Sequence, residues 1–152
     1  MPPHSFLFYL LSLRILNLME NSKGKCINGD CLNGKGTFIY PDGSIYKGFW
    51  KDGKKHGFGS ISFKNGAKYI GHFFEGEYHG KGNGIDAEGN RYEGEWQHNK
   101  EHGFGILVCN EGTIYEGTRV DGKEHGKGTL IYSDGSKCQG QFHEGEMTGK
   151  EK

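Results

Sequence analysis

The sequence predicts an all-β fold: a single elongated, twisted antiparallel meander of stacked 23-residue β-hairpin repeats. Three observations support this prediction. Aromatic residues and glycines recur every 23 positions, the recurring segments alternate with a period of two residues, and pairs such as Asp-Gly and Asn-Gly separate them. The chain has 152 residues, a length that suits one domain, so we expect the repeats to form one array.

The composition agrees with a thin, turn-rich β structure. The chain contains 28 glycines, which bring no side chains to a core and adopt positive φ angles without steric cost. Disordered chains are poor in aromatic residues, whereas this chain has 8 Tyr, 10 Phe and 2 Trp. The sequence therefore predicts an ordered fold without a thick two-layered core.

The repeat can be followed column by column without a gap. A tyrosine begins most units, a glycine follows two residues later, and an aromatic residue follows two residues after that. The three columns contain Tyr46, Tyr69, Tyr92, Tyr115 and Cys138; Gly48, Gly71, Gly94, Gly117 and Gly140; and Trp50, Phe73, Trp96, Arg119 and Phe142. They define a partial unit at 26–45, whole units at 46–68, 69–91, 92–114 and 115–137, and a partial unit at 138–150.

The first strand of each unit is predicted from the two-residue alternation. In one unit Tyr92, Gly94 and Trp96 share one face of the strand, so the glycine leaves room there for rings from neighbouring strands. A further glycine column lies in the following turn, where Asn99 is the only substitute. Asparagine tolerates left-handed backbone geometry, so this column predicts a turn with positive φ.

The second strand carries an apolar column and ends at a glycine-containing pair such as Asp42-Gly43, a strong hairpin signal. The unit at 69–91 departs from this pattern. It has Gly84 and Asp86 where the preceding unit has Ile61 and Phe63, which predicts a local bend or notch.

These columns resemble the MORN repeat (membrane occupation and recognition nexus), as in the segment from Tyr92 to Gly105. The resemblance covers about residues 26–150 and implies the meander fold. It also implies protein scaffolding or contact with anionic phospholipids, the roles associated with this family. Arg119 in the aromatic column, Cys138 in the tyrosine column and the partial first unit depart from the pattern and suggest frayed ends.

Residues 1–25 form an apolar leader with three open interpretations. Its apolar run, residues 6–19, is shorter than the about 20 residues that a membrane-spanning helix needs, and it contains Arg14. A signal peptide would have a basic start and a small-residue cleavage site. The segment fits a short N-terminal helix that caps the array, a degenerate signal or membrane anchor, or a leader outside the fold.

Several chemistries find no support in the sequence. The formal net charge is zero, whereas nucleic-acid binders usually carry an excess of positive charge. The glycine-lysine segments lack the spacing of a phosphate-binding loop, and no catalytic constellation is present. We therefore expect no enzyme, no catalytic residue and no cofactor.

Histidines and cysteines also favour structural roles. His56, His79, His102 and His125 recur once per hairpin, so neighbours lie about 9.5 Å apart and cannot share one metal ion. We expect no metal site and a turn-stabilising hydrogen bond from each histidine. For Cys26, Cys31, Cys109 and Cys138, small and partly buried free thiols are favoured over a disulfide.

Two binding surfaces follow from these patterns. The first is the aromatic face, through which the chain would act as a scaffold or adaptor for a protein partner: Tyr46, Trp50, Tyr69, Phe73, Tyr92, Trp96 and Tyr115. The alternative is peripheral association with anionic phospholipids through the lysine-rich unit and the apolar leader. That unit has one acid, Asp52, and six lysines: Lys47, Lys51, Lys54, Lys55, Lys64 and Lys68.

Charge is distributed unevenly, since the unit at 92–114 has four glutamates against one lysine. Self-association through the open edges of the sheet is also compatible with the pattern. The expected location is the cytoplasm or a membrane periphery, or outside the cell if residues 1–25 act as a signal.

Overall fold

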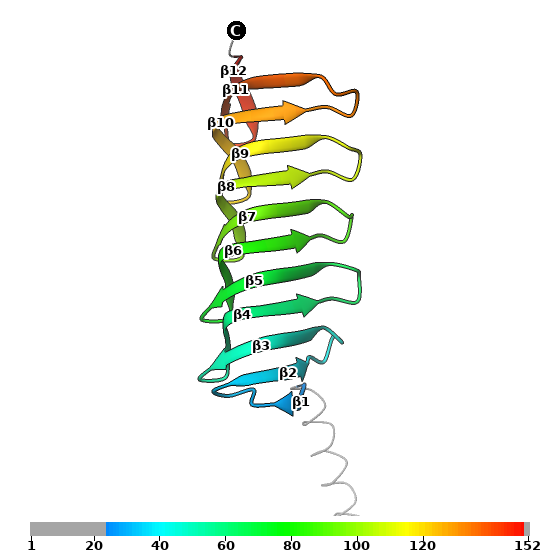
Figure 1. Ribbon diagram of the computed structural model, residues 1–152, viewed down its shortest axis with the longest axis vertical. Helices are drawn as coiled ribbons and strands as arrows, with labels where there is room; N and C mark the ends of the chain where they lie inside the picture. Colours follow the sequence, from blue (N-terminus) through cyan, green and yellow to red (C-terminus); the bar gives the residue numbers. More distant parts are fainter. Residues whose placement is uncertain (1–23, 151–152) are drawn as a thin grey trace, which may run out of the picture.

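A computed structural model describes residues 24–150, which form one open antiparallel sheet of 12 strands in sequence order (Figure 1). The predicted all-β meander is confirmed. The interpretations of the apolar leader fall almost entirely outside the described residues. The strands are β1 (Lys25–Gly29), β2 (Lys35–Ile39), β3 (Ile45–Lys51), β4 (Lys54–Ser62), β5 (Lys68–Phe74), β6 (Glu77–Ile85), β7 (Arg91–Gln97), β8 (Lys100–Val108), β9 (Ile114–Val120), β10 (Lys123–Ile131), β11 (Lys137–His143) and β12 (Glu146–Lys150).

Tight two-residue turns join the two strands of each whole unit. Between β3 and β4, Asp52 and Gly53 have φ angles of 50° and 72°. Positive φ at both central residues defines the type I′ turn, whose twist matches that of the flanking strands. His98 and Asn99 adopt the same geometry, with φ of 50° and 64°, so the predicted left-handed turn is confirmed.

Different turns join one unit to the next. The loop of Pro41, Asp42 and Gly43 has a positive φ only at its glycine, 81°. The Tyr40 amide donates to the Ser44 carbonyl at 2.9 Å, and the Asp42 carboxylate accepts from the Ser44 amide at 2.8 Å. The Asp-Gly pairs therefore belong to three-residue hairpin loops and not to two-residue turns.

A bulge interrupts the hairpin within each whole unit at the histidine-glycine column. Between β3 and β4 the pairing shifts after Gly48, and Gly57 has a φ of 62°. Bulges bend the bulged strand and increase its twist. The histidines consequently lie in bulges and not in the turns to which the sequence assigned them.

A tyrosine ring packed across two glycines forms the centre of each unit. The Tyr92 hydroxyl donates to the Glu95 carbonyl at 3.2 Å, which holds the ring against its own strand. A Cβ atom placed on Gly94 would lie 2.5 Å from the Tyr92 hydroxyl oxygen and 2.7 Å from the Cα of Gly105, its partner on β8. Only glycine fits at these positions, and the three other whole units repeat this arrangement.

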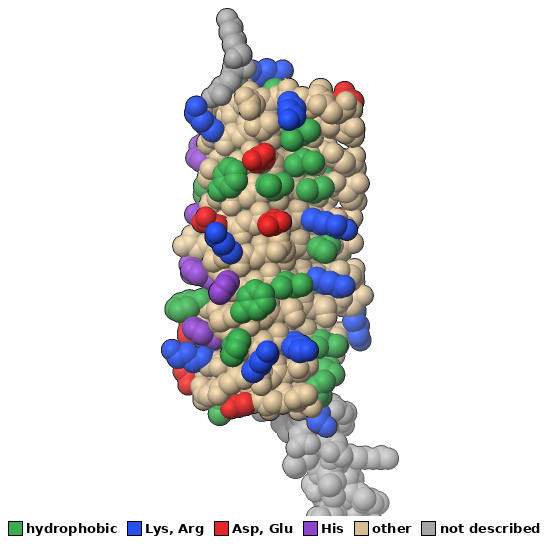
Figure 2. Space-filling model, viewed as in Figure 1, with side chains coloured by type: hydrophobic (Ala, Val, Ile, Leu, Met, Phe, Trp, Pro, Cys, Tyr) green, Lys and Arg blue, Asp and Glu red, His purple; other side chains and the backbone are tan. Residues whose placement is uncertain are grey.

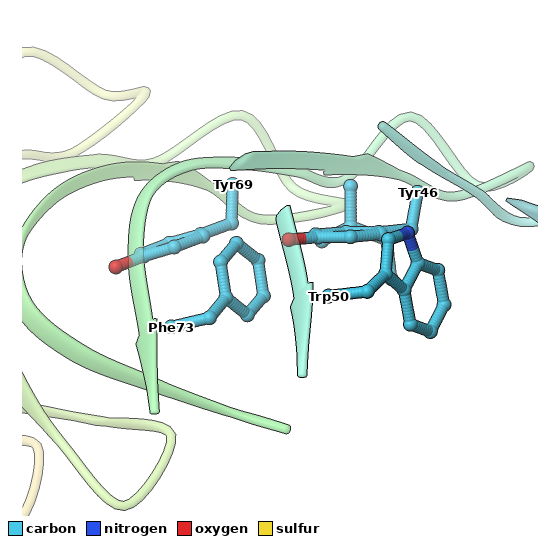
Figure 3. Close-up of a cluster of buried hydrophobic side chains, with 5 residues drawn as sticks. Tyr46, Trp50, Tyr69 and Phe73 are labelled. Atoms are coloured by element: carbon cyan, nitrogen blue, oxygen red, sulfur yellow. The ribbon is translucent and has the colours of Figure 1, made fainter. Parts of the chain in front are cut away.

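Edge-on aromatic contacts link one tyrosine to the next (Figure 3). The Phe73 ring lies between two tyrosines, with centroid distances of 5.0 Å to Tyr46 and 5.2 Å to Tyr69. Trp50 contacts Tyr46 from the other side at 5.0 Å. Edge-to-face geometry is favourable for aromatic pairs, so the rings form a continuous core from Tyr46 to Tyr92.

The cysteine prediction is wrong for one pair. Cys26 and Cys31 form a disulfide that closes the loop between β1 and β2, with a Cα–Cα distance of 6.0 Å. Cys109 and Cys138 are free and half-buried. The five-residue spacing of the first pair does not itself determine pairing, because the approach of the two side chains depends on the β1–β2 turn.

We expect Gly94→Ala to destabilise the fold by about 1–3 kcal/mol, the usual cost of overpacking. The added methyl group would collide with the Tyr92 hydroxyl and the backbone of Gly105. Urea unfolding measures the loss, and Gly149→Ala, whose added Cβ would meet nothing within 4 Å, is the control. Equal stability of both variants would contradict the packing described.

Candidate functional site

The aromatic face predicted to bind a partner is the core of the molecule. Six of its seven rings are buried; the least exposed is Tyr46, at 0%, and the most exposed of the six is Trp50, at 8%. Trp96 alone is half-buried. Rings of the adjacent unit cover Tyr46 and Tyr69, and the Arg119 guanidinium lies over Tyr92 and Tyr115. The prediction of an exposed aromatic surface therefore does not hold for Tyr46, Trp50, Tyr69, Phe73, Tyr92 and Tyr115.

Exposed apolar side chains lie instead on the opposite face, which we call the outer face. They occupy the alternate strand positions that point away from the tyrosine column. Phe58 and Phe104 are 54% and 56% exposed, and Phe49 is 47% exposed. Figure 2 shows apolar side chains scattered among charged ones over the visible face of the array.

The six predicted lipid-binding lysines do not form one patch. Lys47 and Lys68 lie on the outer face, and Lys51 is exposed at the end of β3. Lys54 pairs with Glu75 at 2.6 Å beside a type I′ turn. Lys55 is half-buried on the core face, and Lys64 lies against the three-residue loop of the preceding unit.

Strand pairing places two further lysines on the outer face, neither of which was predicted from the sequence. Lys35 pairs with Phe49, with its ammonium 5.7 Å from the ring centroid, and Lys81 occupies an outward position on β6. We call the outward positions of β2–β6 between the bulges and the loops the basic outer face. They include no carboxylate and consist of Lys35, Thr37, Ile39, Ile45, Lys47, Phe49, Phe58, Ser60, Ser62, Lys68, Ile70, His72, Lys81, Asn83 and Ile85.

The charge of the outer face changes from positive to negative beyond β6. Glu93 pairs with Asn83 on one side and with Ile106 on the other, and Ile106 pairs with Glu116. Glu95 lies in the next row, opposite Lys81. The outward positions of β7–β9 thus combine three glutamates with exposed apolar residues and one cation, Arg91, so negative charge predominates there.

Arg119 in the aromatic column is not at a frayed end, contrary to the prediction. Its side chain is buried, with Nε 2.6 Å from a Glu101 carboxylate oxygen and Nη1 2.6 Å from a Glu124 carboxylate oxygen. The guanidinium carbon lies 5.9 Å from the ring centroids of both Tyr92 and Tyr115. Burial raises the pKa of Glu101 above its usual range, although Arg119 opposes that shift.

A second cation on the core face is Lys55. Its ammonium lies 5.5 Å from the Phe73 ring centroid and 5.9 Å from that of Tyr40. Burial lowers the pKa of Lys55. The core face thus accommodates cations against aromatic rings in two separate units.

The predicted notch in the unit at 69–91 is a pocket on the core face. Gly84 provides no side chain there, and the Trp96 ring lies over it, since a Cβ on Gly84 would be 2.8 Å from the Trp96 Cζ2 atom. Asp86 at the rim accepts hydrogen bonds from the Asn90 amide at 2.9 Å and side chain at 2.7 Å. Slight burial would raise the pKa of Asp86, but these hydrogen bonds outweigh that effect and lower the pKa.

The histidine expectation is wrong in one respect. The Nδ1 atoms of His56 and His102 are buried without a hydrogen-bond partner. His56 instead packs against the Phe74 ring, with a centroid distance of 5.5 Å. Within residues 24–150, no group of three or more His, Cys, Asp or Glu side chains could hold a metal ion.

The model of the MORN repeat family matches the chain six times, over residues 32–45, 46–68, 69–83, 92–114, 115–137 and 138–150. The chain belongs to the MORN repeat family. MORN repeats are generally involved in protein or membrane binding. The match to the third segment ends at residue 83, directly before Gly84, so the pocket lies where this chain departs from the family pattern. The described part of the chain contains no helix long and apolar enough to cross a membrane.

We expect Arg119→Ala to destabilise the array by about 3 kcal/mol, because two largely buried glutamates lose their partner. The deficit relative to the unmodified protein should be smaller at pH 5 than at pH 8. Burial raises the pKa of Glu101, and a carboxyl group with a raised pKa contributes stability below that pKa and loses it as pH rises. Chemical denaturation at both pH values measures this loss of stability. Arg91→Ala, which removes an exposed arginine, is the control. A deficit that grows at pH 5 would contradict this account.

Proposed function

We propose that this MORN protein is a non-enzymatic binding module that docks on anionic membrane surfaces through the basic outer face. The observation that carries this proposal is the combination of outward lysines and exposed aromatic rings in β2–β6, with no carboxylate among those outward positions.

Electrostatic and apolar contributions would act together on this face. Each lysine near an anionic leaflet contributes about 1 kcal/mol. Phe49 and Phe58 are about half exposed, and the Lys35 ammonium lies over the Phe49 ring. Aromatic side chains are favoured at membrane interfaces, where the ring can enter the headgroup region beside the lysine charges. The location that follows is the cytoplasm with peripheral membrane association, or outside the cell if residues 1–25 act as a signal.

A protein partner is a second candidate, favoured by the opposite charge of the remaining outer face. Glu93, Glu95 and Glu116 lie among the exposed Phe104 and Ile106 in β7–β9. Such a surface complements a basic and apolar partner, since matched charge steers association and aromatic residues form binding hot spots. One array could thereby connect a membrane to a protein, which is the role of an adaptor.

The membrane proposal is tested by sedimentation of the full chain with liposomes containing phosphatidylserine. Lys47→Gln with Lys68→Gln removes two outward charges and should weaken binding about 30-fold, the equivalent of about 2 kcal/mol. Binding of the unmodified protein should fall with added salt and vanish on neutral liposomes.

The matched control is Lys64→Gln with Lys100→Gln, which makes the same change in net charge away from the basic outer face. It should bind nearly as tightly as the unmodified protein. Equal loss in both double variants would contradict docking through this face, and no pelleting of the unmodified protein would leave the protein partner as the function to pursue.

A further inference from the structure

The pocket in the unit at 69–91 has a chemistry that the membrane proposal does not use. It opens on the core face, and the residues that line it include five aromatic rings and two carboxylates. The rings are Phe63, Tyr69, Tyr78, Tyr92 and Trp96, and the carboxylates are Asp86 and Glu101. Lys68 borders the pocket from β5, although its side chain lies on the outer face.

Two substitutions in the repeat create the pocket. Gly84 lies in the column that holds Ile61, Leu107 and Leu130 in the other whole units, so an apolar side chain is missing. Asp86 lies in the column of Phe63, which replaces a ring by a short charged group. The hollow therefore arises from this chain's own residues at a place where the other units are filled.

The aromatic walls are held rigidly. Tyr69 and Tyr78 are stacked with a centroid distance of 3.9 Å, and Trp96 meets them edge-on at 5.1 and 5.5 Å. The Trp96 indole nitrogen donates to the Gly82 carbonyl at 3.1 Å, which fixes the ring over Gly84. Trp96 is only half-buried, whereas Trp50 in the same column is buried, so part of the indole is available to a ligand.

The carboxylates make the pocket attractive to a cation. Burial raises the pKa of Glu101, Arg119 opposes that rise, and Glu124 and Asp86 add smaller contributions to it. Asp86 and Glu101 both line the pocket, so a positive charge between them would interact favourably with both carboxylates.

Neighbouring units already hold cations in this way. Arg119 lies over the rings of Tyr92 and Tyr115 and pairs with Glu101, while Lys55 lies over Phe73 and Tyr40. A cation over an aromatic face is attracted by the negative charge of the ring, more strongly when water is excluded. A planar guanidinium can stack on a ring and donate to a carboxylate at the same time.

We propose that the pocket receives the arginine side chain of a protein partner, with the guanidinium against Trp96 and the tyrosine rings and its N–H groups donating to Asp86 and Glu101. The pocket lies on the face opposite the basic outer face, so occupancy would not compete with membrane docking. This inference does not depend on the membrane proposal.

Tryptophan fluorescence provides the test. The Trp50→Phe variant of the full chain leaves Trp96 as the only tryptophan, and Phe73 and Phe142 show that the column accepts phenylalanine. The probe is N-acetyl-arginine amide, and its neutral isostere N-acetyl-citrulline amide is the comparison, both at constant ionic strength. We expect a saturable change in Trp96 emission in the millimolar range with the arginine probe and none with the citrulline probe.

Asp86→Asn should weaken the response to the arginine probe about fivefold, the upper range for a solvent-screened charge pair. Glu93→Gln removes the same charge from the outer face and should leave the response unchanged. Asp86→Phe, which copies Phe63, gives a second test if the asparagine variant loses stability, and it should abolish the response.

Equal responses to both probes, or an unchanged response in Asp86→Asn and Asp86→Phe, would overturn the proposal. Liposome binding by Asp86→Asn should match that of the unmodified protein, because Asp86 lies outside the basic outer face. Failure of the arginine site and failure of membrane docking are thereby separate outcomes.

Discussion

The tyrosine ring that lies across two paired glycines is the constraint on which the rest of this structure depends. Gly94 and Gly105 face each other on adjacent strands, and the Tyr92 ring occupies the space that two Cβ atoms would fill. The hydroxyl donates to the backbone three residues along the chain, which fixes the ring in place. Strand register, the 23-residue period and the position of the bulge must all preserve this packing in every whole unit.

The aromatic rings of the repeat columns are buried in the core. Binding must therefore use the outer face or positions where the repeat pattern is broken. The outer face presents lysines and phenylalanines in β2–β6 and glutamates further along. The main break is Gly84, which leaves Trp96 half-buried beside Asp86. A repeat protein of this kind keeps its fold in the shared columns and can vary its binding chemistry in the remaining ones.

Much of the fold followed from the sequence because the relevant forces are local. The glycine columns, the alternation around Tyr92 and the positive φ at Asn99 could all be predicted from one segment of chain. The exposure of the aromatic face could not, because it depends on how far the bulges at positions such as Gly57 bend the sheet. The prediction that Arg119 marks a frayed end was wrong for a similar reason. Its burial requires two glutamates that only strand pairing brings close.

The most direct test is an NMR measurement of the contacts between the tyrosine rings and the glycine Cα protons in the native protein. The account predicts nuclear Overhauser effects from the Tyr92 ring to Gly94 and Gly105, the corresponding effects in the units of Tyr46, Tyr69 and Tyr115, and upfield ring-current shifts of those glycine protons. Glycine protons at ordinary shifts, with no effect to any tyrosine ring, would contradict the central claim.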